Sequence, residues 1–175
     1  MKTIRIDAAA LLIVLFTAAT VSGCAASHVA WDAKTGIMNH GDARYAVTPP
    51  AGDWKPVSPR GSDLAFFDKN LDAIISSDSL CQPSEDPPLA ALMMHLLIGF
   101  TDIKKQSEAV IPFDGREALK TEYSAKLDGV ERRYLIYILK KDGCVYDLVY
   151  HAPSAKFDQG KPGFETFVSS FRTVK

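Results

Sequence analysis

The sequence has little of what most enzymes and nucleic-acid-binding proteins need. Its 175 residues include three cysteines and four histidines, and its 20 basic and 21 acidic side chains give a formal net charge of −1. Such a balance argues against a nucleic-acid partner, which would require a basic face. The sequence also lacks a glycine-rich phosphate loop, a Gly-x-Ser-x-Gly element and a His-Glu-x-x-His pair. We therefore expect no nucleotide partner, no cofactor, no resident metal and no enzymatic activity.

Long hydrophobic runs are also missing, apart from one near the start. Residues 8–21 are uncharged and almost wholly apolar, but about 14 residues are fewer than the roughly 20 that span a bilayer. The run follows a short basic segment with Lys2 and Arg5, and small residues come after it. This order is typical of an export signal rather than of a transmembrane helix.

Cys24 stands directly after this export signal. The sequence Val21-Ser22-Gly23-Cys24 resembles the lipobox of bacterial lipoproteins. In that family the chain is cut before the cysteine, whose thiol and new amino group receive acyl chains, and several chains together anchor a protein firmly. The resemblance implies cleavage between Gly23 and Cys24, and a lipid bilayer bound through acylated Cys24. Plain signal cleavage nearby is the alternative.

Processing at this point sets the expected domains and the location. Residues 1–23 would be the signal peptide, 24–29 a lipidated tether and 30–175 one domain, which is long enough for its own core. Ala25 follows Cys24, where enterobacterial sorting would use an aspartate to retain a lipoprotein in the inner membrane. By this resemblance we expect the protein in the bacterial cell envelope, on the periplasmic face of the outer membrane.

Cys81 and Cys144 remain when Cys24 is acylated. An even number of cysteines in an oxidising compartment favours a disulfide between them. Two separate buried thiols are an alternative. A metal site is disfavoured because neither cysteine has a second ligand at Cys-x-x-Cys spacing.

Asp-Gly dipeptides recur at a spacing of 14 residues, at 114–115, 128–129 and 142–143. Asp-Gly suits the positive φ angles of a two-residue hairpin turn. The segments around them predict a four-strand antiparallel meander over about 106–151. Earlier strands are expected at 29–38 and 43–48, followed by two around a turn at Asn70.

Two helices are expected beside this sheet. Residues 87–100 carry apolar side chains at helical spacing, and the phenylalanine-rich last segment predicts a terminal helix. Residues 134–139 are apolar on both faces, so their strand needs a layer on each side. The predicted fold class is α+β, an antiparallel sheet flanked by helices in an α/β/α sandwich, with a two-layer arrangement as the alternative.

Three phrases of the sequence carry a further resemblance: "YAVTPPAGDW", "CVYDLVYHAP" and "FETFVSSFR". With the middle helix and the meander between them, the chain over about 45–174 resembles the PsbP, Mog1 and DcrB-like superfamily. The resemblance implies a single Mog1/PsbP-like domain that acts as a binding module. Members bind proteins of different kinds, several bacterial ones are envelope lipoproteins, and no shared catalytic set can be transferred.

The function that we expect is that of a non-catalytic protein-binding or adaptor module, with another envelope protein as partner. Met94, Ile98 and Trp31 are the candidate partner surface. The alternative is a carrier of a small apolar ligand or lipid, for example as an accessory to an envelope transport system, and an enzyme is the third hypothesis. An adaptor should show an exposed apolar patch, a carrier an enclosed apolar pocket, and an enzyme a cleft with perturbed titratable groups.

Two pairs of polar residues are the best candidates in the sequence for a catalytic or metal-binding site. Asp147 and His151 would share one face of a strand at about 13 Å, too far apart for contact, and we interpret them as polar residues at the edge of a sheet. His40 and Asp42, in "NHGD", could bind a metal, but a polar turn is the interpretation that we favour.

Overall fold

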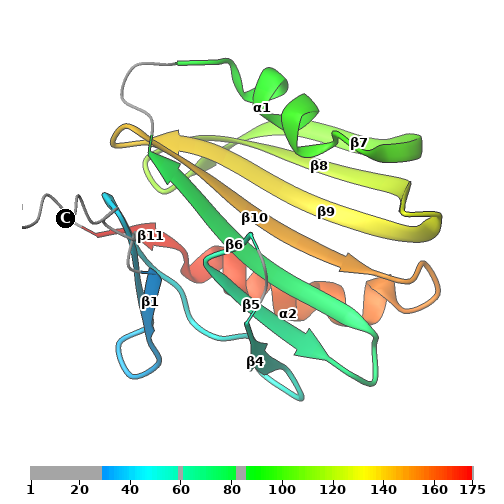
Figure 1. Cartoon of the computed structure of the whole chain (residues 1–175), viewed down its shortest axis with the longest axis horizontal. Helices are drawn as coiled ribbons and strands as arrows, with labels where there is room; N and C mark the ends of the chain where they lie inside the picture. The colour runs from blue at the N-terminus through cyan, green and yellow to red at the C-terminus, as the bar shows by residue number, and fades with distance from the viewer. Residues whose placement is uncertain (1–28, 59–60, 82–85, 175) are drawn as a thin grey trace, which may run out of the picture.

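The structure is a computed structural model that describes residues 29–58, 61–81 and 86–174. The predicted signal peptide, Cys24 and most of the predicted tether lie outside the described residues. Within them the chain forms two antiparallel sheets and two helices (Figure 1). Neither of these helices has the length and apolar character needed to cross a membrane.

The larger sheet has seven antiparallel strands in the order β4-β5-β6-β10-β9-β8-β7. Their bounds are β4 (Lys55–Val57), β5 (Leu64–Asp68), β6 (Ala73–Cys81), β7 (Phe100–Phe113), β8 (Arg116–Leu127), β9 (Val130–Lys141) and β10 (Cys144–Ala152). The predicted meander is confirmed as β7 to β10, although it begins at Phe100 rather than near 106. In each of its three turns the aspartate and the glycine both have positive φ, as a type I′ turn requires.

The smaller sheet has the order β1-β2-β3-β11. Its strands are β1 (Val29–Asp32), β2 (Ile37–His40), β3 (Ala43–Ala46) and β11 (Arg172–Thr173). The predicted single strand over 29–38 is therefore wrong. The Asp32 carboxylate accepts bonds from the Lys34 N–H at 2.9 Å and the Thr35 hydroxyl at 2.8 Å, and these local bonds fold the segment into a hairpin turn.

One face of the larger sheet is covered by α2 (Phe157–Ser170) together with the smaller sheet. Phe164 of α2, Tyr150 of β10 and Tyr45 of β3 are fully buried in this layer. Alternation along β10 directs every second side chain into it, from Cys144 to Ala152. This layer is the main core of the protein.

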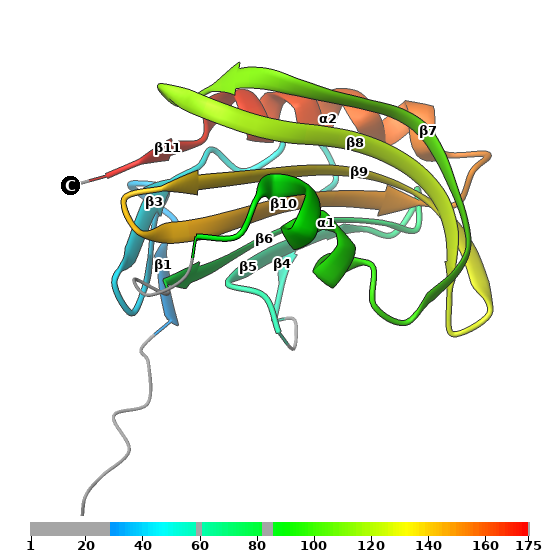
Figure 2. The same cartoon turned by 90° about the horizontal axis from the view of Figure 1, so that it is seen from above.

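The opposite face carries α1 (Leu89–Leu96), so that the two helices lie on opposite sides of the sheet (Figure 2). Met93 and Leu97 pack onto β8 and β9. The α/β/α arrangement predicted from the sequence is confirmed. The helix is shorter than the predicted 87–100, because Gly99 has φ of 90° and β7 begins at Phe100. An eight-residue helix covers only part of this face and leaves room beside it over β6 and β10.

Candidate functional site

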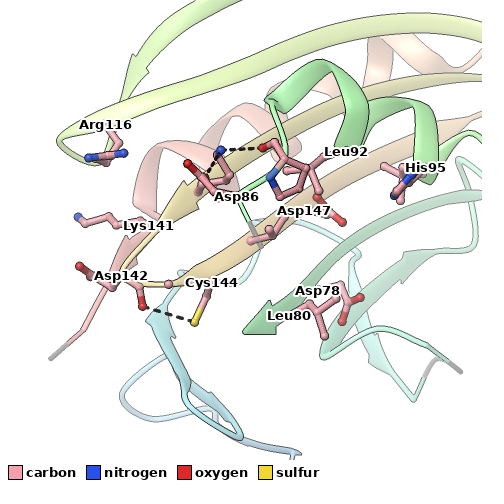
Figure 3. A pocket seen from close by; sticks show the side chains of 15 residues that line it. Asp78, Leu80, Asp86, Leu92, His95, Arg116, Lys141, Asp142, Cys144 and Asp147 are labelled. Carbon is pink, nitrogen blue, oxygen red and sulfur yellow. Dashed lines mark hydrogen bonds and ion pairs between the residues drawn. The ribbon is translucent and has the colours of Figure 1, made fainter. Parts of the chain in front are cut away.

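A cleft with a volume of about 1000 Å³ lies beside α1 (Figure 3). It is bounded by α1, the end of β6 and the β9–β10 turn. Leu92 and Leu96 of α1, Leu80 of β6 and Val145 of β10 give it apolar walls. The cleft lies beside α1 because this helix packs on β8 and β9 and leaves this part of β6 and β10 without a covering layer.

Charged side chains of both signs border the cleft near the β9–β10 turn. Lys140 Nζ bonds Asp86 Oδ1 at 2.5 Å and the Pro87 carbonyl at 2.6 Å. Lys141 Nζ bonds the Asp114 carboxylate at 2.9 Å. The first pair holds the segment that leads into α1 against β9, and so fixes one wall of the cleft.

Two aspartates face each other across neighbouring strands in the cleft. Asp147 of β10 is the direct cross-strand partner of Asp78 of β6, and both line the cleft. Because Tyr146 and Leu148 belong to the core under α2, alternation turns Asp147 towards the opposite face. Oδ1 of Asp147 is buried and accepts no hydrogen bond from the described residues. The two aspartates therefore lie on the same face of the sheet.

This environment shifts both carboxyls towards their neutral forms. Burial raises the pKa of Asp147 to about 7, and the charge of Asp78 adds to the effect. Burial likewise raises the pKa of Asp78 to about 6, with the nearby Asp63 carboxyl as the next cause. Near neutral pH the pair can therefore donate as well as accept hydrogen bonds.

Asp147 and His151 do not form a joint site. The interpretation that they lie at the edge of a sheet is wrong, because β10 runs between β6 and β9. His151 instead packs against Tyr134, with ring centroids 5.4 Å apart. Burial, followed by the positive charge of Arg132, lowers the pKa of His151 to about 4. The imidazole is therefore neutral at pH 7 and belongs to the interior.

A second polar group lies where β2 of the smaller sheet meets β6 of the larger one. His40 Nδ1 is 2.6 Å from Asp63 Oδ1. One ligand atom each from His40, Asp63 and Asp78 lie within 4.8 Å of one another. Oδ2 of Asp63 accepts hydrogen bonds from the hydroxyls of Tyr45 at 3.1 Å and Ser79 at 2.5 Å. Asp78 thus belongs to this group and also to the cleft.

Sequence reasoning missed this second group. It paired His40 with Asp42, which lies in the exposed β2–β3 turn, so the interpretation of "NHGD" as a polar turn holds for Asp42 alone. His40 comes instead to lie beside Asp63 and Asp78, which belong to distant parts of the chain. No spacing in the sequence signals this group, since it depends on how the two sheets pack.

The three residues predicted to form a partner surface have different environments. Met94 on α1 is 66% exposed, and Ile98, which follows the end of α1, is 76% exposed. Trp31 is partly buried, and its ring packs edge-on against Phe66 with centroids 5.6 Å apart. Its indole nitrogen is buried without a hydrogen-bond partner among the described residues. Met94 and Ile98 are therefore accessible to a partner, and their role in binding one stays a prediction.

The disulfide between Cys81 and Cys144 is present. The two residues are direct cross-strand partners at the end of β6 and the start of β10. The bond confirms the favoured pairing over the alternative of two separate thiols. Cys144 also lines the cleft, so the bridge fixes the strand separation at one end of it.

The architecture is that of a PsbP-like α+β domain. It is similar to a cyanobacterial PsbP (CyanoP) from Synechocystis, with a TM-score of 0.52 and 16% identity over 89% of this chain and 98% of that chain. It is also similar to LpqN, involved in cell envelope biogenesis of Mycobacterium tuberculosis, with a TM-score of 0.56 and 12% identity over 77% and 86% of the two chains. No family model and no curated protein matches the sequence. At these identities the likeness establishes the fold, and it confirms the PsbP-like fold predicted from the sequence.

Proposed function

We propose that the protein is a lipid-anchored module of the bacterial cell envelope that binds another envelope protein and performs no chemistry of its own. The composition of α1 carries this proposal: its eight residues include no charged side chain and one polar side chain, His95. A helix that is apolar on every side is normally buried, yet only Met93 of α1 is buried. A partner that covers α1 would remove this apolar surface from water.

Charge favours a protein over a membrane as the partner on this surface. The cleft beside α1 is bordered by the basic side chains of Arg116, Lys140 and Lys141 and by the acidic side chains of Asp86 and Asp142. An anionic bilayer would attract the first set and repel the second. A protein surface can present opposite charges to both.

The envelope location rests on the lipobox-like sequence at Cys24. The likeness in fold to LpqN, a protein involved in cell envelope biogenesis, is consistent with it. Acyl chains on Cys24 would hold the domain at the periplasmic face of the outer membrane, where α1 could meet partners on the same membrane.

A native mass spectrum of the protein, extracted gently from its own membrane, tests the proposal. We expect an acylated chain with a stoichiometric protein companion. Met94→Lys and Ile98→Lys should each lose the companion without a change in unfolding temperature, because both side chains are exposed. Val110→Lys is the matched control, since Val110 is 57% exposed on β7 and should leave the complex intact. A companion retained by both variants would overturn the proposed surface.

Carriage of a small ligand is the second candidate. The cleft of about 1000 Å³ supports it, because small-molecule sites commonly have about this size. However, the cleft is not the enclosed apolar pocket expected of a carrier, since it is partly open and contains Asp78 and Asp147. A lone acylated chain with a bound small mass in the same spectrum would favour the carrier.

The non-catalytic part of the proposal rests on the residues that line the cleft. The raised pKa values of Asp78 and Asp147 are a feature that catalytic clefts also show. The described lining offers no serine, threonine or tyrosine hydroxyl, and its one cysteine, Cys144, is in the disulfide. A side-chain nucleophile of those types is therefore not available there, and we assign the buried Asp147 carboxyl to hydrogen bonding with the partner.

A further inference from the structure

We propose that His40, Asp63 and Asp78 form a binding site for a divalent transition-metal ion of the zinc type, at the junction of the two sheets. The ligand atoms of the three residues lie within 4.8 Å of one another. They offer one imidazole nitrogen and two carboxylate oxygens, a donor set that suits such an ion. This proposal differs from the expectation drawn from the sequence, which was that the protein has no resident metal.

The buried carboxylate of Asp63 supplies independent support. Its side chain is 1% exposed, and within the described part of the chain its Oδ1 atom has no hydrogen-bond partner. His40 Nδ1 lies 2.6 Å from this oxygen in an ion-pair contact, which an ion bound to both atoms would replace. Because buried polar atoms are normally satisfied, this oxygen requires the imidazole or a shared ion as its partner, and an ion would satisfy both ligand atoms.

The other oxygen of Asp63 is held as in a typical metal site. Oδ2 accepts hydrogen bonds from the Tyr45 and Ser79 hydroxyls. The Tyr45 hydroxyl is also 2.8 Å from the Ser77 hydroxyl, which fixes its direction. Carboxylate ligands are commonly oriented by such outer hydrogen bonds. The hydroxyls therefore fix the carboxylate with Oδ1 towards His40.

The donor set also selects the class of ion. Calcium and magnesium prefer oxygen ligands throughout, whereas an imidazole nitrogen favours zinc and its neighbours in the first transition row. Two donors of a tetrahedral zinc ion lie roughly 3.3 Å apart, so the His40 ring would turn away from Asp63 by less than about 1 Å. Its side chain is 26% exposed, which permits that movement.

Solvent can reach the site through a second, smaller groove. This groove has a volume of about 650 Å³ and is lined by His40, Asp63 and Asp78, with Trp31 and Leu80 among the apolar residues. An ion could enter by this route and keep an open position for water. Because His40 belongs to β2 and Asp78 to β6, the ion would also join the smaller sheet to the larger one.

Calorimetric titration of the untagged, acylated protein in detergent tests the site. The protein is first treated with a chelator and then titrated with zinc chloride. We expect one zinc ion per chain and a higher unfolding temperature with zinc. His40→Gln and Asp78→Asn should each weaken binding by about 100-fold or more, and Ser79→Ala by about 10- to 100-fold.

His95→Gln is the matched control, because His95 is an exposed histidine on α1 outside the cluster. It should bind zinc as the wild type does. Asp63→Asn removes a buried carboxylate and can prevent folding, so the decision rests on His40→Gln and Asp78→Asn. Zinc binding that both variants leave unchanged would overturn the proposal, as would no saturable binding or tighter binding of calcium or magnesium. None of these outcomes depends on the partner protein proposed above.

Discussion

At the scale of single residues, three polar side chains on the α1 face of the larger sheet make the stability of the protein depend on pH. Asp78, Asp147 and His151 are all partly shielded from water, and each has a shifted pKa. Their positions follow from the alternation of β6 and β10, which places large apolar side chains under α2 and leaves these polar ones on the other face. Burial is the largest cause of all three shifts, so stability must depend on pH.

His151 gives the clearest test at this scale. Its pKa is about 4 in the folded protein against 6.5 for an ordinary histidine. Between these values the unfolded chain binds a proton that the folded chain does not. The free energy of unfolding should therefore fall as the pH falls from 6.5 to 4, by at most about 3 kcal/mol from this residue. Urea denaturation at closely spaced pH values should show a shallower decline for His151→Phe than for the wild type.

The matched variant for this test is His95→Gln, which removes an exposed histidine on α1. It should follow the wild-type profile. Equal slopes for the wild type and His151→Phe would mean that the imidazole is not shielded as the structure shows.

At the scale of elements, sequence reasoning succeeded where a local signal decides the structure. The three Asp-Gly turns specify the meander because their positive φ angles suit hairpins. It failed at 29–38, where we expected a single strand. There the Asp32 side chain and Gly36, with φ of 70°, make a turn instead. A side chain that bonds a backbone N–H two residues further on can thus replace a continuous strand with a turn.

Gly36 and Gly41 provide a matched pair for this turn. Both have positive φ, so alanine at either position should cost about 1–2 kcal/mol. A Cβ at Gly36 would also collide with the Val47 carbonyl oxygen, whereas a Cβ at Gly41 meets nothing within 4 Å. Gly36→Ala should therefore lose a further 1–3 kcal/mol, roughly the cost of overpacking. Urea unfolding of both variants measures the difference, and equal losses would show that the hairpin moves to accept the side chain.

At the scale of the whole molecule, the candidate sites depend on pairings that the sequence does not reveal. The cleft needs β6 beside β10 and a helix that packs on β8 and β9 instead, and the proposed metal site needs β2 against β6. Local patterns predict strands and turns, but they do not specify which distant strands become neighbours. The Cys81–Cys144 pair was the exception, because cysteine number and compartment together favoured a bridge between β6 and β10.

Removal of this bridge tests how far it stabilises the molecule. It joins residues 63 apart in the sequence, and in the chain-entropy model closing such a loop stabilises the folded state by about 4 kcal/mol. The double variant Cys81→Ala with Cys144→Ala should lose stability of this order in urea, and the reduced wild-type protein should match it. The two residues are direct cross-strand partners. The folded variant should therefore keep the β6–β10 pairing while its free energy of unfolding is lower. A loss below about 1 kcal/mol would instead mean that the β6–β10 pairing persists in the unfolded chain or needs no covalent support.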